Sequence, residues 1–248
     1  MKLASRTKIL IYVLCLLLVL CTSVVMTMAY LVDTDETVNT FTIGQVHIKL
    51  DEAAVDANGD LEYEADGTTL KARVTGNEYH LLPGQSYVKD PTLSVIEGSE
   101  AAYVRMTVTL NKADVLKSVF GTGFLPEHYV DGWDRTTWEC VKITESTDGK
   151  NLTYEFRYRE PAANSLDGTV DNLVDASRAS GDLAMKPLFE KFTVPGVING
   201  DQLKALAEGE EFKITVNGHA IQAAGFASEN LAWAAFDEQY AREQAQQP

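Results

Sequence analysis

Apolar and polar residues alternate along most of the chain, and a period of two predicts β-strands with one buried face. In the stretch 102–110, Val104, Met106 and Val108 alternate with Arg105 and Thr107. We expect the three apolar side chains to be buried, and Arg105 and Thr107 to point to solvent or to a partner. About eight strands of this kind are predicted, at residues 46–50, 70–74, 87–96, 102–110, 138–143, 152–158, 188–194 and 212–216.

Turn sequences and short helical stretches fill the spaces between the predicted strands. Turns are expected at Asn58-Gly59, Asp66-Gly67, Pro83-Gly84, Asp148-Gly149, Pro195-Gly196 and Asn217-Gly218. Helices are expected at 112–120 after the cap residue Asn111, at 201–208, and from Ser228 onward. Strands with one solvated face favour a mainly β fold, an antiparallel two-sheet sandwich of jelly-roll or immunoglobulin-like type with short peripheral helices.

The N-terminus has the composition of a secretory signal peptide. Basic residues precede an apolar run at 9–25, and the small residue Ala29 follows it. This order predicts cleavage between Ala29 and Tyr30. The alternative is a permanent membrane anchor, because the run is just long enough to span a bilayer. The predicted organisation is a signal peptide (1–29), an N-terminal segment (30–41) and a β-sandwich domain with a C-terminal helix (42–248).

Cleavage makes an acidic chain more acidic. The whole chain has a formal net charge of −15, and the loss of Lys2, Arg6 and Lys8 changes it to −18. Nucleic acids and anionic lipids bind to basic patches. We therefore expect no nucleic-acid partner, and contact with a membrane only before cleavage.

Cysteine usage excludes a disulfide framework. Cys15 and Cys21 leave with the signal peptide, so Cys140 is the only thiol of the mature chain. No neighbouring histidine would activate it as a nucleophile. We interpret Cys140 as a small buried residue of a strand, in a fold that depends on its hydrophobic core.

Local motifs for metal or serine catalysis are missing from the sequence. It contains no His-Glu-x-x-His and no Gly-x-Ser-x-Gly. His47, His80, His128 and His219 lie far apart and are interpreted as ordinary surface or strand residues. A zinc site assembled from distant residues stays open as an alternative.

One acidic loop resembles part of a calcium site. Asp56, Asn58 and Asp60 place oxygen atoms at alternate positions, as a calcium-binding loop does. Leu61 and Gly67, however, stand where such a loop has its glycine and its glutamate. A hairpin turn at 58–59 is the alternative, and no cofactor is expected beyond this calcium candidate.

Aromatic and acidic residues also occur together in the sequence Asp131-Gly132-Trp133-Asp134, with Trp138 beyond it. A loop of this composition is suited to binding a ligand. Burial of both tryptophans in the core explains the pattern as well.

Several segments resemble, in order and spacing, the TasA/camelysin family of exported proteins from Gram-positive bacteria. The segments are Met28-Ala29-Tyr30-Leu31-Val32-Asp33-Thr34-Asp35, Asn39-Thr40-Phe41-Thr42-Ile43-Gly44, His80-Leu81-Leu82-Pro83-Gly84 with Asp90-Pro91, Glu100-Ala101-Ala102-Tyr103-Val104-Arg105, and Ala220-Ile221-Gln222-Ala223-Ala224-Gly225-Phe226 with Ala232-Trp233. Residues 51–69 and 121–137 have no counterpart in these motifs. The resemblance implies a jelly-roll-like sandwich that is exported through an ER-type signal peptidase to the cell surface or a biofilm matrix.

The resemblance also implies a mode of assembly. In fibre-forming members of the family, the freed N-terminal segment of one subunit completes a sheet of the next. Here Tyr30, Val32, Val38 and Phe41 supply the apolar residues of such a segment. An exposed sheet edge would accept it through backbone hydrogen bonds. A flexible, solvated leader is the alternative for so acidic a segment.

Three hypotheses about function follow. The favoured one is a secreted structural subunit of the extracellular matrix or cell surface, which associates with itself and with other matrix proteins after a signal peptidase has released it. The second is a camelysin-like surface metalloprotease, and the third is an adhesin-like binding module that does not polymerise. Under the first hypothesis the protein is not an enzyme.

The cleavage site gives the first prediction. Ala29→Arg should leave the precursor attached to the membrane, because a bulky charged residue does not fit a site that selects a small one. Fractionation and mass spectrometry of the N-terminus measure this. Secretion of the variant with trimming at the same bond would show that the assigned junction is wrong.

Overall fold

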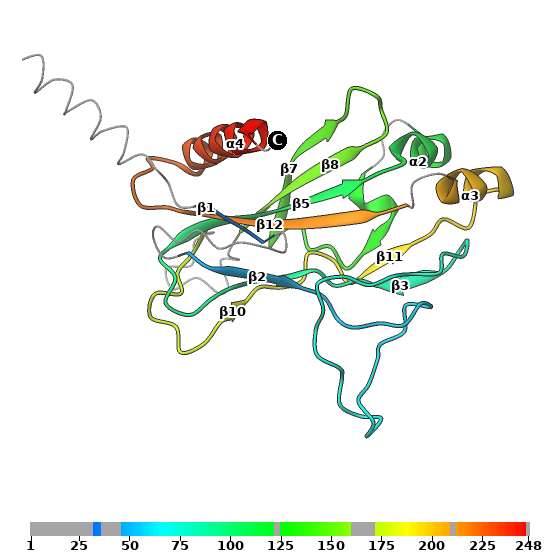
Figure 1. Ribbon diagram of the computed structural model, residues 1–248, viewed down its shortest axis with the longest axis horizontal. Coiled ribbons are helices and arrows are strands. Elements are labelled where there is room, and N and C mark those ends of the chain that lie inside the picture. Colours follow the sequence, from blue (N-terminus) through cyan, green and yellow to red (C-terminus); the bar gives the residue numbers. More distant parts are fainter. Residues whose placement is uncertain (1–31, 36–45, 122–124, 160–171, 209–211, 247–248) are drawn as a thin grey trace, which may run out of the picture.

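The computed structural model describes residues 32–35, 46–121, 125–159, 172–208 and 212–246 (Figure 1). The predicted cleavage site, at Ala29 and Tyr30, lies outside the described residues, and so do Val38 and Phe41. Of the predicted assembly residues, Val32 is described, as the first residue of a strand.

Most elements are strands, with a few helices between them. The strands are β1 (Val32–Asp35), β2 (Ile48–Asp51), β3 (Ser86–Val88), β4 (Thr92–Val95), β5 (Ala102–Leu110), β6 (Val130–Asp131), β7 (Trp138–Glu145), β8 (Leu152–Tyr158), β9 (Leu173–Val174), β10 (Leu183–Ala184), β11 (Lys191–Thr193) and β12 (Ile214–Gln222). The helices are α2 (Ala113–Phe120), α3 (Gly200–Ala207) and α4 (Glu229–Gln246), with a 3-10 turn, η1, at Pro126–His128.

The strands form several antiparallel sheets, one of them curled into half a barrel, and the largest sheet has six strands. Its order is β1-β12-β5-β8-β7, with β9 also paired to β5. Two three-stranded sheets have the orders β10-β4-β2 and β3-β11-β6. Figure 1 shows α4 on one side of the large sheet and β2 and β10 on the other. The prediction of a mainly β, antiparallel protein is confirmed.

The hydrophobic core joins all three sheets. Val104, Met106 and Val108 of β5 are at most 1% exposed, so the predicted buried face is confirmed. Leu93 of β4 and Tyr87 of β3 are fully buried in the same core. Full burial of a large apolar side chain contributes roughly 1.5–3 kcal/mol. Such packing stabilises the assembly of separate sheets into one body.

The prediction that Arg105 points to solvent is wrong, because α4 covers the outer face of the large sheet. Arg105 is 5% exposed. Its guanidinium donates to Asp237 of α4 (2.6 Å) and lies 3.6 Å from Glu155 of β8. It also lies over the rings of Trp233 and Phe236, 4.4 and 4.7 Å from their centroids. A charged residue on a polar strand face is therefore buried by a helix that is distant in sequence.

The predicted turn at Asn217-Gly218 is also wrong. Gly218 lies inside β12, opposite Met106 of β5. A Cβ atom at this position would lie 2.6 Å from the Cδ1 atom of Leu93. The glycine is needed because β4 and β12 approach each other here, and a side chain would separate the two sheets.

Two predicted strands are not continuous in the structure. The stretch 70–74 makes isolated bridges at Leu70 and Val74 and is not a continuous strand. The stretch 87–96 is divided into β3 and β4, with Pro91 between them. Proline has no backbone donor and restricts the residue before it, so the chain changes sheet at this point.

Asn111 does not cap α2 as predicted. Its Oδ1 atom accepts a hydrogen bond from the backbone nitrogen of Lys213 (2.7 Å). Lys112 precedes the helix with a φ of 58° and makes no side-chain cap. At α3, in contrast, Asn199 and Gln202 form a capping box.

The faces of β5 give the second prediction. Met106→Ala should lower the free energy of unfolding by roughly 2–5 kcal/mol, because a fully buried side chain leaves a cavity. Thr107→Ala, at a partly exposed position, should change it by about 0.5 kcal/mol or less. Denaturant titration of both variants measures this, and equal effects would contradict the assigned faces.

Candidate functional site

One edge of the large sheet is extended by the N-terminal strand. β1 pairs antiparallel with β12, with Val32 opposite Ile221 and Asp35 opposite Gly218. β12 pairs with β5 along all of its 9 residues, whereas β1 has 4. In the described part of the chain, no strand pairs with residues 214–217 of β12 on the side away from β5. We call residues 214–217 the free edge.

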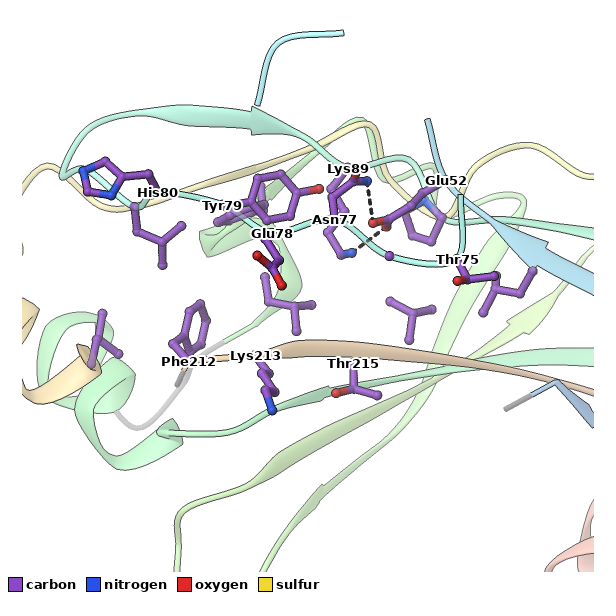
Figure 2. A pocket seen from close by; sticks show the side chains of 18 of the residues that line it. Glu52, Thr75, Asn77, Glu78, Tyr79, His80, Lys89, Phe212, Lys213 and Thr215 are labelled. Carbon is purple, nitrogen blue, oxygen red and sulfur yellow. Dashed lines mark hydrogen bonds and ion pairs between the residues drawn. The ribbon is translucent and has the colours of Figure 1, made fainter. Parts of the chain in front are cut away.

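A groove of about 970 Å³ lies along the free edge (Figure 2). One wall includes Phe212, Lys213 and residues 214–216 of the free edge, together with apolar residues of α3. The opposite wall is the segment 75–81. Figure 2 shows Glu78 pointing from that segment towards the wall that carries Lys213 and Thr215. A row of strand backbone beside apolar and polar side chains is the arrangement that accepts an added β-strand.

A buried ion pair lies at one end of the groove (Figure 2). The Nζ atom of Lys89 is 2.5 Å from Oε2 of Glu52, and these side chains are 9% and 5% exposed. Asn77 donates from Nδ2 to Oε1 of the same carboxylate (2.8 Å). Burial raises the pKa of the neighbouring Tyr79, and the Glu52 carboxylate acts in the same direction. Sequence reasoning missed this cluster because its members follow no motif spacing.

The opposite edge of the large sheet, β7, is less suited to strand addition. Its pairing with β8 is interrupted by a bulge between Cys140 and Lys142. Bulges and charged residues are means by which edge strands avoid pairing with other chains. Cys140 is half-buried, and burial raises the pKa of its thiol. Cys140 packs against the core, as expected, but it is only partly buried.

The calcium candidate forms a turn. Oδ1 of Asp56 accepts hydrogen bonds from the backbone nitrogens of Asn58 (2.8 Å) and Asp60 (3.1 Å). These bonds lower the pKa of the Asp56 carboxyl. Val55 and Leu61 bridge just outside the turn. The carboxylate therefore serves the backbone of the turn, as the hairpin alternative predicts.

The tryptophan loop is filled by the protein's own groups. Nε1 of Trp133 donates to the carbonyl of Trp138 (2.8 Å), and Nε1 of Trp138 donates to the carbonyl of Lys186 (2.9 Å). Trp138 is fully buried. A Cβ atom at Gly132 would lie 2.6 Å from Glu190, so the loop is closely packed. Trp138 is therefore a core residue, as the second interpretation predicts, whereas Trp133 is partly buried and packs against the core.

Metal-binding groups are not found among the described residues: no cluster there has three or more His, Cys, Asp or Glu side chains placed to hold an ion. His219 of β12 is buried beneath α4, with its ring 5.1 Å from that of Phe236. Burial lowers the pKa of His219 to about 3, and the guanidinium of Arg105 acts in the same direction. In the described structure, its Nδ1 atom has no hydrogen-bond partner.

The chain matches no known family model, no curated protein and no solved structure. Within the described residues, no helix is long and apolar enough to cross a membrane.

The buried histidine gives the third prediction. Its folded pKa lies below the unfolded value, so the unfolded state binds the additional proton and acid reduces stability. Between pH 6 and pH 4 this should cost roughly 2–3 kcal/mol. His219→Phe should remove that part of the pH dependence in denaturant titrations. The exposed control His80→Gln should keep it, and identical profiles for both variants would contradict the assignment.

Proposed function

We propose that the protein is a secreted structural subunit of a cell-surface or biofilm-matrix assembly, and that subunits associate by strand addition. In this proposal the N-terminal segment of one subunit pairs with β12 of the next. The observation that carries the proposal is the position of β1. The predicted donor segment forms a strand on β12, and β12 continues beyond β1 into a groove.

The register of β1 indicates how much further a donor strand could extend. The observed antiparallel pairs run from Val32 opposite Ile221 to Asp35 opposite Gly218. Continued in the same register, residues 36–39 would face the free edge, and Val38 would face Thr215. Such a strand would supply hydrogen bonds to backbone groups along the groove.

In the described subunit, β1 pairs with its own chain. Exchange of the same strand between identical subunits replaces one pairing with an equivalent one, which is a low-cost route to association. The favourable free energy of assembly would then come from filling the groove. The mature net charge of −18 opposes association, so salt should promote it by screening.

The resemblance to the TasA/camelysin family supports this proposal and its finer fold, a jelly-roll-like sandwich. Two of the resembling segments contact each other: Arg105, in the segment 100–105, lies over the ring of Trp233, in the motif 232–233. The metalloprotease and adhesin alternatives gain no comparable support. No described cluster suits a metal ion, and the indole nitrogen of Trp133 is bonded to the backbone carbonyl of Trp138.

Deletion of residues 30–40 gives the fourth prediction. The shortened mature protein should stay folded, because the segment contributes only the edge strand β1 and β12 keeps its pairing with β5, but it should not form polymers. Negative-stain microscopy and circular dichroism measure the two properties. Added to intact subunits, the shortened protein should also reduce polymer length, because it keeps an acceptor edge and lacks a donor.

A peptide of residues 30–40 is the matched reagent for this experiment. It should bind the shortened protein and raise its thermal midpoint, whereas a peptide of the same composition in scrambled order should not. Polymers that form equally well without residues 30–40 would rule out this donor. A protein that stays monomeric at every salt concentration would rule out the polymer itself.

A further inference from the structure

Three polar side chains meet at the buried end of the groove in an arrangement suited to a covalent reaction. One carboxylate, that of Glu52, binds two different groups through its two oxygens. Oε2 lies 2.5 Å from Nζ of Lys89, and Oε1 accepts from Nδ2 of Asn77 (2.8 Å). Figure 2 shows the carboxylate between the amine and the carboxamide. An amine, a base and an amide are thus held together within one small site.

The cluster is unusual as a means of stabilisation alone. Lys89 and Glu52 are both buried. Removal of two charges from water costs several kcal/mol, and a buried pair often stabilises a fold no better than apolar residues would. Buried ionisable groups in a concave site are candidates for chemistry.

The groups around Asn77 match the needs of attack on its carboxamide carbon. Its Oδ1 atom accepts a hydrogen bond from the backbone nitrogen of Val55 (3.0 Å). That donor would stabilise negative charge on the oxygen as the carbon becomes tetrahedral. Nδ2 also donates to the carbonyl of Ala53 (2.9 Å), which fixes the plane of the amide. The amide is therefore oriented from three sides.

Aromatic side chains limit access of water to the amine. Nζ of Lys89 lies 5.9 Å from the ring centroid of Tyr79. That ring packs edge-on against Tyr87 and Phe192, with centroid distances of 5.7 and 5.2 Å. Shielding from water strengthens the interactions of polar groups, and binding of both groups by one carboxylate favours an intramolecular reaction.

We propose that Lys89 and Asn77 join in an isopeptide bond, formed by the protein itself with Glu52 as the acid–base group. Glu52 takes a proton from the ammonium, and the neutral Nζ attacks Cγ of Asn77. The bond between Nζ and Cγ forms, and the bond between Cγ and Nδ2 breaks as Glu52 gives that proton to the departing nitrogen. Nζ still carries two hydrogens after the attack, so it loses one of them to the Glu52 carboxylate, and Glu52 releases this second proton to solvent. One ammonia molecule leaves, and nothing is oxidised or reduced.

This crosslink would tie the segment 75–81, which forms one wall of the groove, to the residue that follows β3. It would give a secreted chain that has a single mature cysteine a covalent constraint near its candidate assembly site. The inference concerns the folded subunit and stands independently of the proposed polymer.

The test is the mass of the intact mature protein together with a tryptic map. The mass should be lower than the sequence mass by one ammonia. Trypsin should fail to cut after Lys89, so a single peptide 74–105 should replace the peptides 74–89 and 90–105. A single backbone cleavage between residues 77 and 89 of that peptide should release no separate fragments, because the isopeptide bond still joins the two sides.

Variants distinguish the formation of this bond from other reactions that release ammonia. Lys89→Arg, Asn77→Ala and Glu52→Gln should each have the full mass of their sequence. The control is Lys186→Arg, which replaces an exposed lysine paired with Asp134; its mass should be lower by one ammonia, like that of the wild type. A wild-type protein of full sequence mass overturns the proposal, whether or not the variants fold. So does a protein that has lost ammonia but is still cut after Lys89, because ring closure at Asn77 alone would give that result.

Discussion

The pairing of β12 with β5 is the interaction on which the remaining structure depends. It runs in register from Ile214 opposite Leu110 to Gln222 opposite Ala102. One face of this pair carries the core, and the other carries α4. The outer edge of β12 carries β1 at one half and the groove at the other. A single strand therefore links the core, the helix that covers the sheet and the candidate assembly site.

The two faces of this pair are held by different forces. The inner face packs apolar side chains closely enough that Gly218 leaves room for Leu93. The outer face holds Arg105 in contact with Asp237 and Glu155 beneath α4. A buried guanidinium destabilises the fold unless its partners remain in place. Its contacts with Asp237 and the rings of α4 therefore fix the position of the helix on the sheet. Protonation of His219, which lies beneath α4 and close to Arg105, would add a second positive charge to this buried face.

Periodicity in the sequence was sufficient to predict the class of fold and most of the long strands. β5 and β8 extend over the predicted residues because their alternation is strict and their inner faces are buried. Short strands such as β9 and β10 were missed, since 2 residues carry no periodic signal. Gly218 was misinterpreted because a turn and a close contact between sheets require the same residue type.

The candidate site was predictable only in part. The N-terminal segment was identified from its resemblance to exported proteins, and Val32 does lie in a strand on β12. The groove and its Glu52–Lys89 pair were not foreseen. They depend on three distant parts of the chain, and contacts over such distances leave no local pattern in a single sequence.

Polymers grown from an equal mixture of heavy-isotope-labelled and unlabelled subunits test the central claim most directly. A photo-crosslinking amino acid in place of Val38 would mark the residues that the N-terminal segment contacts. Strand addition predicts adducts with residues 214–216 in which the two peptides carry different labels, at the frequency of random pairing between subunits. Adducts in which both peptides always carry the same label would show that the segment stays on its own subunit, and would contradict the account.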